Sequence, residues 1–221
     1  MSYIPVFEPA TPTEAYQMFL EAVILSKKYQ MPVIFRLTTH VCHAKEVIKF
    51  GPIVEKQNKF VPSFDRKNGP YLPITRAVFP LKKNAIDRLG KMEKESENSI
   101  YNKVHSPFGL EQINGKKLGI ISSSMPVLSI QENLDKAKKP VDLLQLNFSF
   151  PLPKEKVTDY LKNHDEVIII EELDRVMEYE IKSLAFDRNI KCKILSRTDE
   201  EDLMGELGTE RTWKKIGRAH V

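Results

Sequence analysis

Three short apolar runs in the second half of the chain decide the fold: KLGIIS at 117–122, VDLLQLN at 141–147 and EVIIIE at 166–171. Helices are predicted between and after these runs, at 124–137, 154–162 and 175–188. One more strand is predicted at 192–196. Strands that alternate with helices at this spacing form parallel sheets with right-handed crossovers. The sequence therefore predicts an α/β fold with an open parallel sheet.

A second strand–helix–strand pattern stands at the N-terminal end. It begins with a short strand from Ile4 to Phe7, and Thr11 with Glu14 forms a capping box that opens a helix. Apolar residues then recur at helical spacing and predict a buried stripe, namely Ala15, Met18, Phe19, Ala22 and Val23. The apolar run at 32–38 is typical of a strand buried on both faces of a parallel sheet. No upstream strands complete this sheet, so we expect an N-terminal portion to be missing.

These patterns predict four segments. Residues 1–45 form the end of one domain, and residues 46–114, which contain several prolines and a charged helix-prone stretch, form a connector. Residues 115–210 form a second domain that we expect to fold alone. Residues 211–221 form a truncated end. Its last six residues, IGRAHV, continue no pattern and match one reading frame of a sequencing adapter, so we expect a non-native tail.

Composition narrows the class of protein. The 34 basic residues nearly balance the 30 acidic ones, so we expect no nucleic-acid partner. No apolar run approaches the roughly 20 residues that span a bilayer, and the N-terminus lacks a signal-peptide pattern, so we expect no membrane partner. Cys42 and Cys192 are the two cysteines, which excludes a disulfide framework and suits a reducing, cytoplasmic location.

The densest polar cluster, Thr38 to His43, follows the predicted strand at 32–38, where ligands gather in open α/β sheets. Alternation along a strand predicts that His40 and Cys42 point together and His43 away. Three potential ligands so close in sequence cannot readily surround one ion, so no metal site is predicted. A loop lining a ligand site or a domain interface and a purely structural loop both remain open.

Three further features have competing interpretations. Arg36 lies within the apolar strand and needs either an acidic partner, which we favour, or a ligand anion. Ser122–Ser124 could bind an anion at a helix N-terminus, although capping of that helix is the simpler interpretation. Glu171 and Glu172 point to opposite faces of a strand, so one is expected to face a cleft and the other to cap or pair. No catalytic constellation with recognisable spacing is present.

The chain resembles the 2-oxoacid:ferredoxin oxidoreductases, and most of all the alpha subunit of indolepyruvate ferredoxin oxidoreductase. The resemblance covers roughly residues 3–210 and rests on the order of several segments: Pro5-Val-Phe-Glu-Pro, Glu14-Ala15, the run from Pro32 to His43, Leu118-Gly-Ile-Ile-Ser-Ser-Ser, Phe150-Pro-Leu-Pro, Ile170-Glu-Glu and Gly205-Glu-Leu. Two departures are His40, where the family usually has Arg, and Cys42, where it usually has Ser. If that Arg contacts cofactor or substrate in the family, His40 puts the substrate assignment in doubt.

The resemblance implies the end of a thiamine-diphosphate-binding pyrimidine-type domain, followed by a transketolase-C-terminal-like domain. The family's whole enzyme decarboxylates aryl 2-oxoacids oxidatively to acyl-CoA. It uses thiamine diphosphate with Mg²⁺ and 4Fe–4S clusters, and works with a beta subunit, ferredoxin and coenzyme A. On this basis Arg36, Thr38, Thr39 and His43 are the candidate cofactor-binding residues.

The resemblance also places the family's main cofactor motifs outside the 221 residues, so this chain is expected to be an internal fragment. Two cysteines cannot supply the four thiolates that a 4Fe–4S cluster needs. We therefore expect the fragment alone to bind no cofactor and to be inactive. The alternatives are a fragment of a pyruvate or 2-oxoglutarate type of the same enzyme class, and a non-catalytic α/β binding domain.

Overall fold

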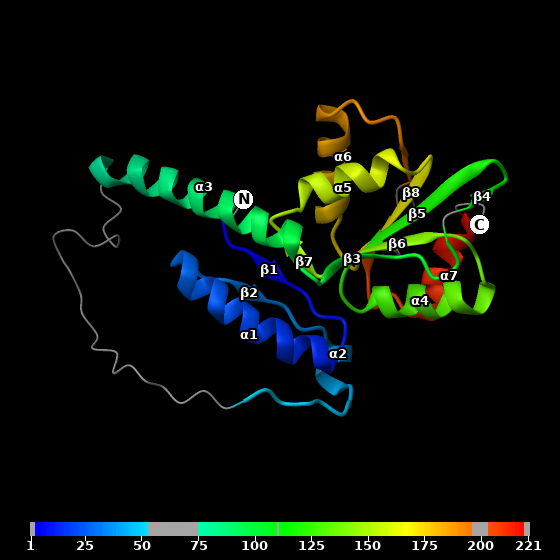
Figure 1. The fold of residues 1–221 in the computed structure, drawn as a ribbon, viewed down its shortest axis with the longest axis horizontal. Coiled ribbons are helices and arrows are strands. Elements are labelled where there is room, and N and C mark those ends of the chain that lie inside the picture. Colours follow the sequence, from blue (N-terminus) through cyan, green and yellow to red (C-terminus); the bar gives the residue numbers. More distant parts are fainter. Residues whose placement is uncertain (1–2, 53–74, 110, 196–202, 219–221) are drawn as a thin grey trace.

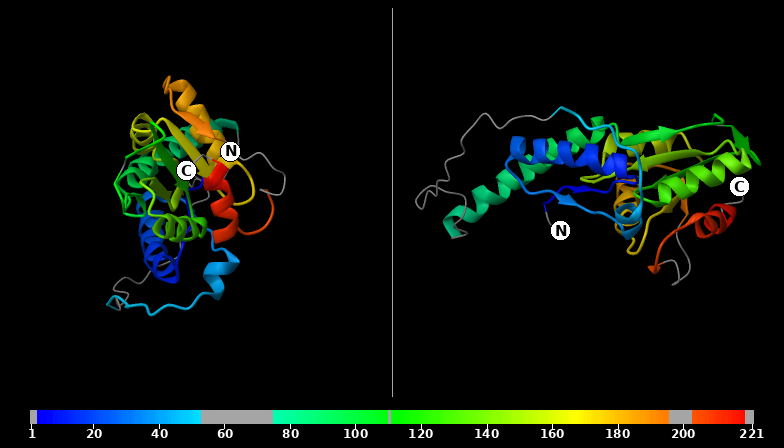
Figure 2. Two further views of the ribbon diagram at one scale, coloured as in Figure 1. Left: turned by 90° about the vertical axis from the view of Figure 1, so that its right-hand side faces the viewer. Right: turned by 90° about the horizontal axis from the view of Figure 1, so that it is seen from below.

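The computed structural model describes residues 3–52, 75–109, 111–195 and 203–218 (Figure 1). Parts of the expected connector (53–74), the end of the predicted last strand (Ser196) and the end of the expected tail (219–221) lie outside the described residues. The two further views in Figure 2 show α1 (Pro12–Tyr29) and α3 (Thr75–Asn98) toward one end of an elongated molecule. The main sheet lies toward the other end.

The main sheet has a parallel core in the order β6-β5-β8-β9, which confirms the predicted fold class. Its strands are β5 (Lys116–Ser122), β6 (Asp142–Leu146), β8 (Glu166–Ile170) and β9 (Lys193–Leu195). In the central pair, Ile120 lies opposite Ile168 and Ile121 lies opposite Ile169. Successive side chains of a strand point to opposite faces, so each of these strands contributes to two separate apolar layers.

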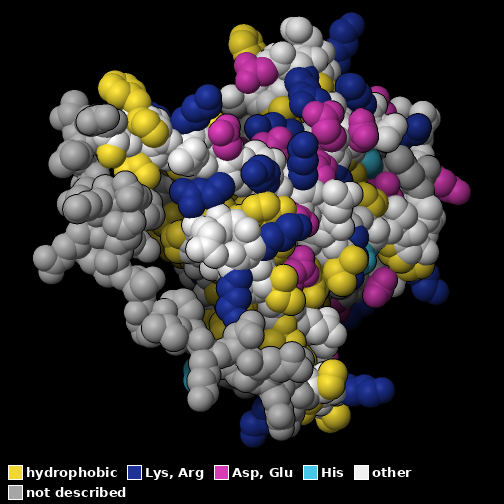
Figure 3. Space-filling model, turned by 60° about the vertical axis from the view of Figure 1, so that its left-hand side comes forward, with side chains coloured by type: hydrophobic (Ala, Val, Ile, Leu, Met, Phe, Trp, Pro, Cys, Tyr) yellow, Lys and Arg dark blue, Asp and Glu magenta, His cyan; other side chains and the backbone are white. Residues whose placement is uncertain are grey.

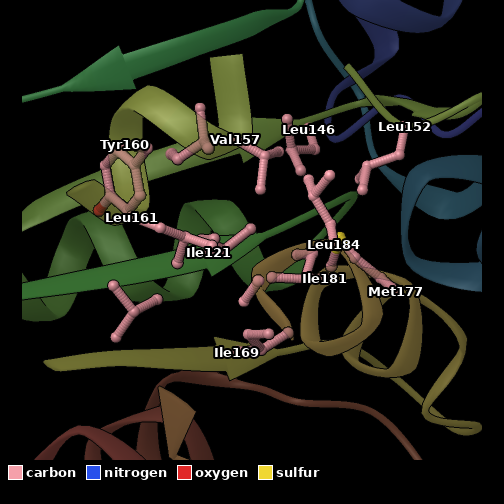
Figure 4. Close-up of a cluster of buried hydrophobic side chains, with 13 residues drawn as sticks. Ile121, Leu146, Leu152, Val157, Tyr160, Leu161, Ile169, Met177, Ile181 and Leu184 are labelled. Atoms are coloured by element: carbon pink, nitrogen blue, oxygen red, sulfur yellow. The ribbon is translucent and has the colours of Figure 1, made fainter. Parts of the chain in front are cut away.

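Helices cover both faces of this sheet. On one face, α5 (Lys154–Lys162) and α6 (Val176–Asp187) pack on the layer that contains Ile121 and Ile169 (Figure 4). On the other, α4 (Pro126–Ala137) packs on the layer that contains Ile120 and Ile168. Each fully buried isoleucine contributes about 1.5–3 kcal/mol relative to an exposed one. The continuous apolar runs thus reflect strands buried on both faces.

Two strands that were not predicted from the sequence join the main sheet in antiparallel orientation. β3 (Asn102–His105) pairs with β6 at the edge of the sheet, and β4 (Gln112–Ile113) forms a hairpin with β5. β3 falls within the segment expected to be a connector. Its sequence, NKVH, is mostly polar, because an edge strand with one exposed face needs no apolar run.

The second sheet has the order β2-β1-β7. β1 (Val6–Phe7) pairs parallel with β2 (Ile34–Phe35) and antiparallel with β7 (Phe148–Phe150). Asn147 alone separates β7 from β6, so the chain passes from one sheet to the other within a single residue. Phe7 and Phe148 are both fully buried and stack with ring centroids 4.0 Å apart. The two sheets are therefore joined through their own strands.

Several expectations for the N-terminal unit need correction. The run at 32–38 is not a strand buried on both faces, because only Ile34–Phe35 is strand and Ile34 is 44% exposed at the sheet edge. In α1, Met18 and Ala22 are buried as predicted, but Phe19 is 52% exposed and Leu25 takes its place in the core. Ala15 and Val23, the other two residues of the predicted stripe, are only partly buried.

The C-terminal segment also differs from expectation. α7 (Thr209–Arg218) packs against α4, and Ile216 is fully buried in the layer that contains Ile130 and Leu134. Residues 216–218 therefore continue a helical pattern, contrary to the expectation of a patternless end. None of the helices in the described part of the chain is both long and apolar enough to cross a membrane.

Candidate functional site

A pocket of about 460 Å³ lies between the second sheet and the carboxyl ends of β5 and β8. Its walls come from β1, β2, β7, the loops that follow β5 and β8, and the first turns of α6: Ile4, Val6, Glu8, Arg36, Ser123, Ser149, Phe150, Glu171, Glu172, Leu173, Asp174, Val176, Met177 and Glu180.

The topology of the main sheet explains the place of this pocket. The chain leaves β5 through α4 to β6 on one side, and later returns through α5 to β8 on the other side of β5. The strand order therefore reverses at β5, which makes the crevice at the carboxyl ends of β5 and β8 a topological switch point. Ligands of open α/β sheets bind at such points.

Arg36 lies on the pocket side of the second sheet. Because Val6 pairs with Ile34, alternation places Val6, Glu8, Ile34 and Arg36 on one face. The guanidinium of Arg36 forms an ion pair with the carboxylate of Glu8, which is itself buried. Of the two interpretations of Arg36, the acidic partner is therefore the one that the structure shows. Glu8 was missed, although it directly follows the first predicted strand.

The paired carboxylates at the end of β8 have separate tasks. Glu171 is buried and accepts hydrogen bonds from the backbone N–H groups of Met177 (2.9 Å) and Glu178 (3.0 Å) at the start of α6. A carboxylate is favourable there because the N-terminus of a helix carries partial positive charge. Glu172 accepts a hydrogen bond from the backbone N–H of Leu207 at 3.0 Å. The first therefore caps α6, and both line the pocket.

The remaining charge of the pocket is negative. Asp174 and Glu180 also line it, and burial raises the pKa of the Glu180 carboxyl, partly offset by Lys154. Five carboxylates thus face one guanidinium, and that guanidinium is neutralised by Glu8. Such a pocket does not suit a diphosphate, which needs free cations or unpaired backbone N–H groups.

The other predicted site residues lie beyond this pocket. Thr38 caps the short helix α2 (Thr39–His43), and its hydroxyl accepts from the N–H of Val41 at 3.4 Å. Thr39 and His43 are exposed. His40 and Cys42 therefore lie on a helix, and the prediction of strand alternation for them is wrong. The structure brings Arg36 to the pocket but leaves Thr38, Thr39 and His43 outside its lining.

Two serines of the segment at the end of β5, Ser122 and Ser124, make structural hydrogen bonds, whereas Ser123 lines the pocket. Ser122 donates from its hydroxyl to the carbonyl of Ile170 at 2.6 Å. The N–H of Ser124 donates to Asn147 Oδ1 at 2.8 Å and is therefore occupied. The Ser124 side chain bonds the carbonyl of Pro9 and does not cap α4, so the expected side-chain cap is wrong.

The thiols do not fit an iron–sulfur cluster. Cys42 is exposed on α2, whereas burial raises the pKa of the Cys192 thiol to about 11, which disfavours the thiolate that binds metal. Within the described ranges, no group of three or more His, Cys, Asp or Glu side chains is arranged to hold a metal ion.

The segments that carry the family resemblance converge on the pocket. Glu8 comes from Pro5-Val-Phe-Glu-Pro, and Arg36 comes from the run from Pro32 to His43. Ser123 belongs to the segment that begins at Leu118, and Phe150 opens the Phe-Pro-Leu-Pro step. Glu172 comes from Ile-Glu-Glu and holds Leu207 of the Gly-Glu-Leu segment. These distant parts of the sequence therefore build one place in the fold.

Comparisons with known proteins agree with this resemblance, although no protein-family model matches the chain. The chain is 30% identical over 220 residues to indolepyruvate oxidoreductase subunit IorA of Pyrococcus horikoshii, covering 97% of this chain and 33% of that subunit. It is 27% identical over 200 residues to the IorA subunit of Methanothermobacter marburgensis, covering 90% and 31%. The chain thus spans about one third of the length of these curated relatives.

Two solved structures share the fold. A 2-oxoglutarate:ferredoxin oxidoreductase from Magnetococcus marinus matches with a TM-score of 0.54 at 13% identity, over 97% of this chain and 42% of that chain. A split-gene transketolase matches with a TM-score of 0.51 at 12% identity, over 99% and 58%. The predicted resemblance is confirmed. Nearly the whole of this chain is related in sequence to a region that makes up about one third of the length of the IorA subunit of indolepyruvate oxidoreductases.

Proposed function

We propose that this chain forms one third of an IorA-type subunit of an indolepyruvate oxidoreductase. The whole enzyme would convert aryl 2-oxoacids to acyl-CoA and pass the electrons to ferredoxin. The observation that carries the proposal is the 30% identity to an IorA subunit over 97% of the chain. The convergence of the resembling segments on one pocket at a topological switch point supports it.

Within that enzyme, the task of this chain is to hold two α/β units in a defined relative position. Glu14 of α1 accepts hydrogen bonds from Gln145 Nε2 (3.0 Å) and Asn147 Nδ2 (2.7 Å), which lie on or next to β6. The N–H of Glu8 donates to the carbonyl of Asn147 at 2.7 Å. These bonds, together with the passage from β6 to β7, connect the sheets without a flexible linker.

The proposal assigns thiamine diphosphate with Mg²⁺ and the 4Fe–4S clusters to other parts of the enzyme, because the described residues fit neither group. A beta subunit, ferredoxin and coenzyme A are the proposed partners. A cytoplasmic location is proposed because both cysteines are free, which suits a reducing compartment. Arg36, Thr38, Thr39 and His43 remain candidates to meet a cofactor brought to them by another part.

The test uses the polypeptide encoded by the complete reading frame at this locus, purified with its beta subunit. We expect ferredoxin reduction that depends on an aryl 2-oxoacid and coenzyme A, with indolepyruvate preferred over pyruvate and 2-oxoglutarate. Preference for either of the latter two would establish the alternative enzyme type. No activity with any 2-oxoacid, under conditions where an archaeal IorA enzyme is active, would refute the proposal.

The candidate residues are tested in the same assay. Thr39→Ala and His43→Ala should each lower kcat/KM at least about tenfold if these exposed side chains contact cofactor or substrate. The matched control is Val47→Ala, because Val47 is 98% exposed on the same segment. Equal activity of all three variants would remove Thr39 and His43 from the site.

A further inference from the structure

The first half of α3 extends away from the rest of the described chain (Figure 1). None of residues 77–90 is buried, whereas Met92 in the second half is fully buried. Phe79 and Ile86 are 78% and 49% exposed, and they share one face because seven residues make about two turns. Met92 follows Ile86 by six residues and therefore lies on the other side of the helix. The outer side of α3 thus carries an exposed apolar stripe.

The outer face of α6 carries a second apolar stripe with the same spacing. Tyr179 and Phe186 are also seven residues apart, and they are 63% and 84% exposed. Met177 and Ile181 of the same helix are buried against the main sheet. A helix that is apolar on both sides is normally covered on both sides. Seven residues span about 10.5 Å on either helix, so the stripes of α3 and α6 match in length.

The charges beside the two stripes are opposite in sign. Lys82 and Lys83 flank the stripe of α3 and form no ion pair within the described ranges. Figure 3 turns the left-hand side of the molecule forward and shows hydrophobic side chains exposed beside those of Lys and Arg. On α6, Glu180 and Asp187 each follow an aromatic residue of the stripe, and they too lack an ion pair among the described residues. Such complementarity favours pairing of the two helices.

The other flank of α6 adds little positive charge. Lys182 pairs with the buried carboxylate of Glu178 at 2.7 Å. Arg175 stands at the start of the helix, directly after Asp174 and close to Glu172, which both line the pocket. The outer face of α6 is therefore acidic overall.

Both stripes belong to one frame, because α3 and α6 are anchored on the same turn of α5. Glu97 of α3 accepts a hydrogen bond from the N–H of Glu155 at 2.7 Å. Arg188, which follows α6, donates to the carboxylate of Glu155 at 2.8 Å. In a two-fold pair of chains each contact occurs twice, with the same two surfaces exchanged. Surfaces held at a fixed relative position suit such a reciprocal contact.

We infer that two copies of this chain associate about a two-fold axis, with the first half of α3 of each copy docked on the outer face of α6 of the other. Phe79 and Ile86 then meet Tyr179 and Phe186, while the lysines of α3 approach the carboxylates of α6. Exposed apolar patches with polar rims mark protein interfaces. The inference uses only surfaces of these 221 residues, so it does not depend on the proposed function.

The test is sedimentation velocity of the 221-residue chain over a series of concentrations, where a monomer–dimer equilibrium is expected. Phe79→Ala should raise the Kd of the dimer at least about tenfold, because aromatic anchors carry much of the binding energy of an interface. Phe108→Ala is its control, at an exposed phenylalanine that belongs to neither stripe. It should leave the Kd within about twofold of the unsubstituted chain.

Charge reversal tests which surfaces meet. Lys82→Glu combined with Lys83→Glu should raise the Kd at least about tenfold, because it places carboxylates against the acidic face of α6. Glu180→Lys combined with Asp187→Lys should do the same from the other side. A mixture of the two doubly substituted chains should form a dimer at concentrations where each alone is monomeric, since opposite charges then face each other at both contacts.

The matched control is Lys45→Glu combined with Lys49→Glu, which changes the net charge equally at exposed positions outside both stripes. Equal Kd values for this control and the Lys82/Lys83 double substitution would overturn the inference, as would a mixture of reversed chains that stays monomeric. A chain that remains monomeric up to about 100 µM would overturn it too, and would leave the two stripes to a different polypeptide.

Discussion

Gly119 of β5 is a position where a single methyl group matters. A Cβ atom there would lie 2.7 Å from Tyr160 Oη and 2.8 Å from His164 Cδ2. The Tyr160 hydroxyl accepts from the N–H of Ile120 at 3.0 Å and donates to the carbonyl of Asp142 at 2.7 Å. Burial raises the pKa of Tyr160 well above its usual range, so the hydroxyl keeps its proton. The ring cannot move aside without breaking these bonds.

Gly119→Ala should therefore destabilise the protein by about 1–3 kcal/mol, as overpacking of a filled core does. Urea unfolding followed by circular dichroism measures the effect. The control is Gly90→Ala in α3, where a Cβ meets nothing within 4 Å and the helix should gain up to about 1 kcal/mol. Equal stability of Gly119→Ala and the unsubstituted protein would show that Tyr160 and His164 are not confined.

At the scale of elements, Glu14 couples α1 to the main sheet. Besides Gln145 and Asn147, its carboxylate accepts from the N–H of Ala10 at 2.9 Å, while its own N–H donates to the Thr11 hydroxyl at 3.1 Å. The side chain thus accepts from the backbone just before α1 and from two amide groups of the other unit. The predicted capping box anticipated the role of Thr11 but not these long-range bonds.

Glu14→Gln replaces an acceptor oxygen by an amide donor that faces other donors. We expect a loss of about 1–3 kcal/mol in the free energy of unfolding, the usual cost of leaving buried donors without an acceptor. The control is Gln17→Ala, an exposed position on the same helix, which should change stability by less than about 0.5 kcal/mol. Similar effects of both substitutions would contradict the coupling role.

A charged contact joins three strands at the start of β8. Glu166 is buried and pairs with Lys116 of β5 and, at 3.4 Å, with Lys193 of β9. The hydrogen bond from Lys116 lowers the pKa of the Glu166 carboxyl below its ordinary value of 4.5. A group whose pKa is depressed by folding stabilises the folded state above its unfolded pKa, and this stabilisation is lost as the pH falls through the folded pKa.

The unsubstituted protein should therefore lose more stability than Glu166→Gln when the pH falls below 4.5, because the substitution removes this titrating group. Urea midpoints at about pH 6 and about pH 3 measure the difference. Glu111→Gln, at an exposed carboxylate, serves as the control and should follow the unsubstituted protein. Identical pH profiles for all three proteins would exclude a contribution from Glu166.

For the whole molecule, the unit around the main sheet extends beyond the limits of 115–210 expected from the sequence. β3 forms one edge of the sheet, and α7 covers a face with Ile216, while Asn133 of α4 donates to the Thr209 carbonyl (2.8 Å) and the Thr212 hydroxyl (2.9 Å). β3 lies wholly outside those limits, and all of α7 after its first two residues does. Their removal exposes one strand edge and one apolar face.

A chain of residues 100–218 should therefore unfold cooperatively, whereas one of residues 115–210 should be less stable by about 3 kcal/mol or more. Loss of the buried Ile216 alone accounts for about 1.5–3 kcal/mol of this difference. Thermal unfolding by calorimetry compares the two. Equal cooperativity and stability would mean that β3 and α7 contribute nothing to this unit.

A site residue could be predicted from the sequence where its signal is local, and not where it depends on contacts between distant segments. Arg36 could be identified as a charge that needs a partner, because an apolar run around an arginine is a local signal. Its partner Glu8 could not, since the pairing depends on two short strands lying side by side. The pocket as a whole was equally hidden, because its walls come from segments as distant as Ile4 and Glu180.

The sequence by itself determined the order of helices and strands in the second half of the chain, because strands buried on both faces must be apolar throughout. It could not reveal that the chain leaves the main sheet at Asn147 to form β7, which pairs with β1, or that β3 forms the edge of the main sheet beside β6. Those pairings are made by short, partly polar strands whose hydrogen bonds run to distant residues. Only the tertiary structure decided them, since backbone pairing across a sheet leaves little trace in local composition.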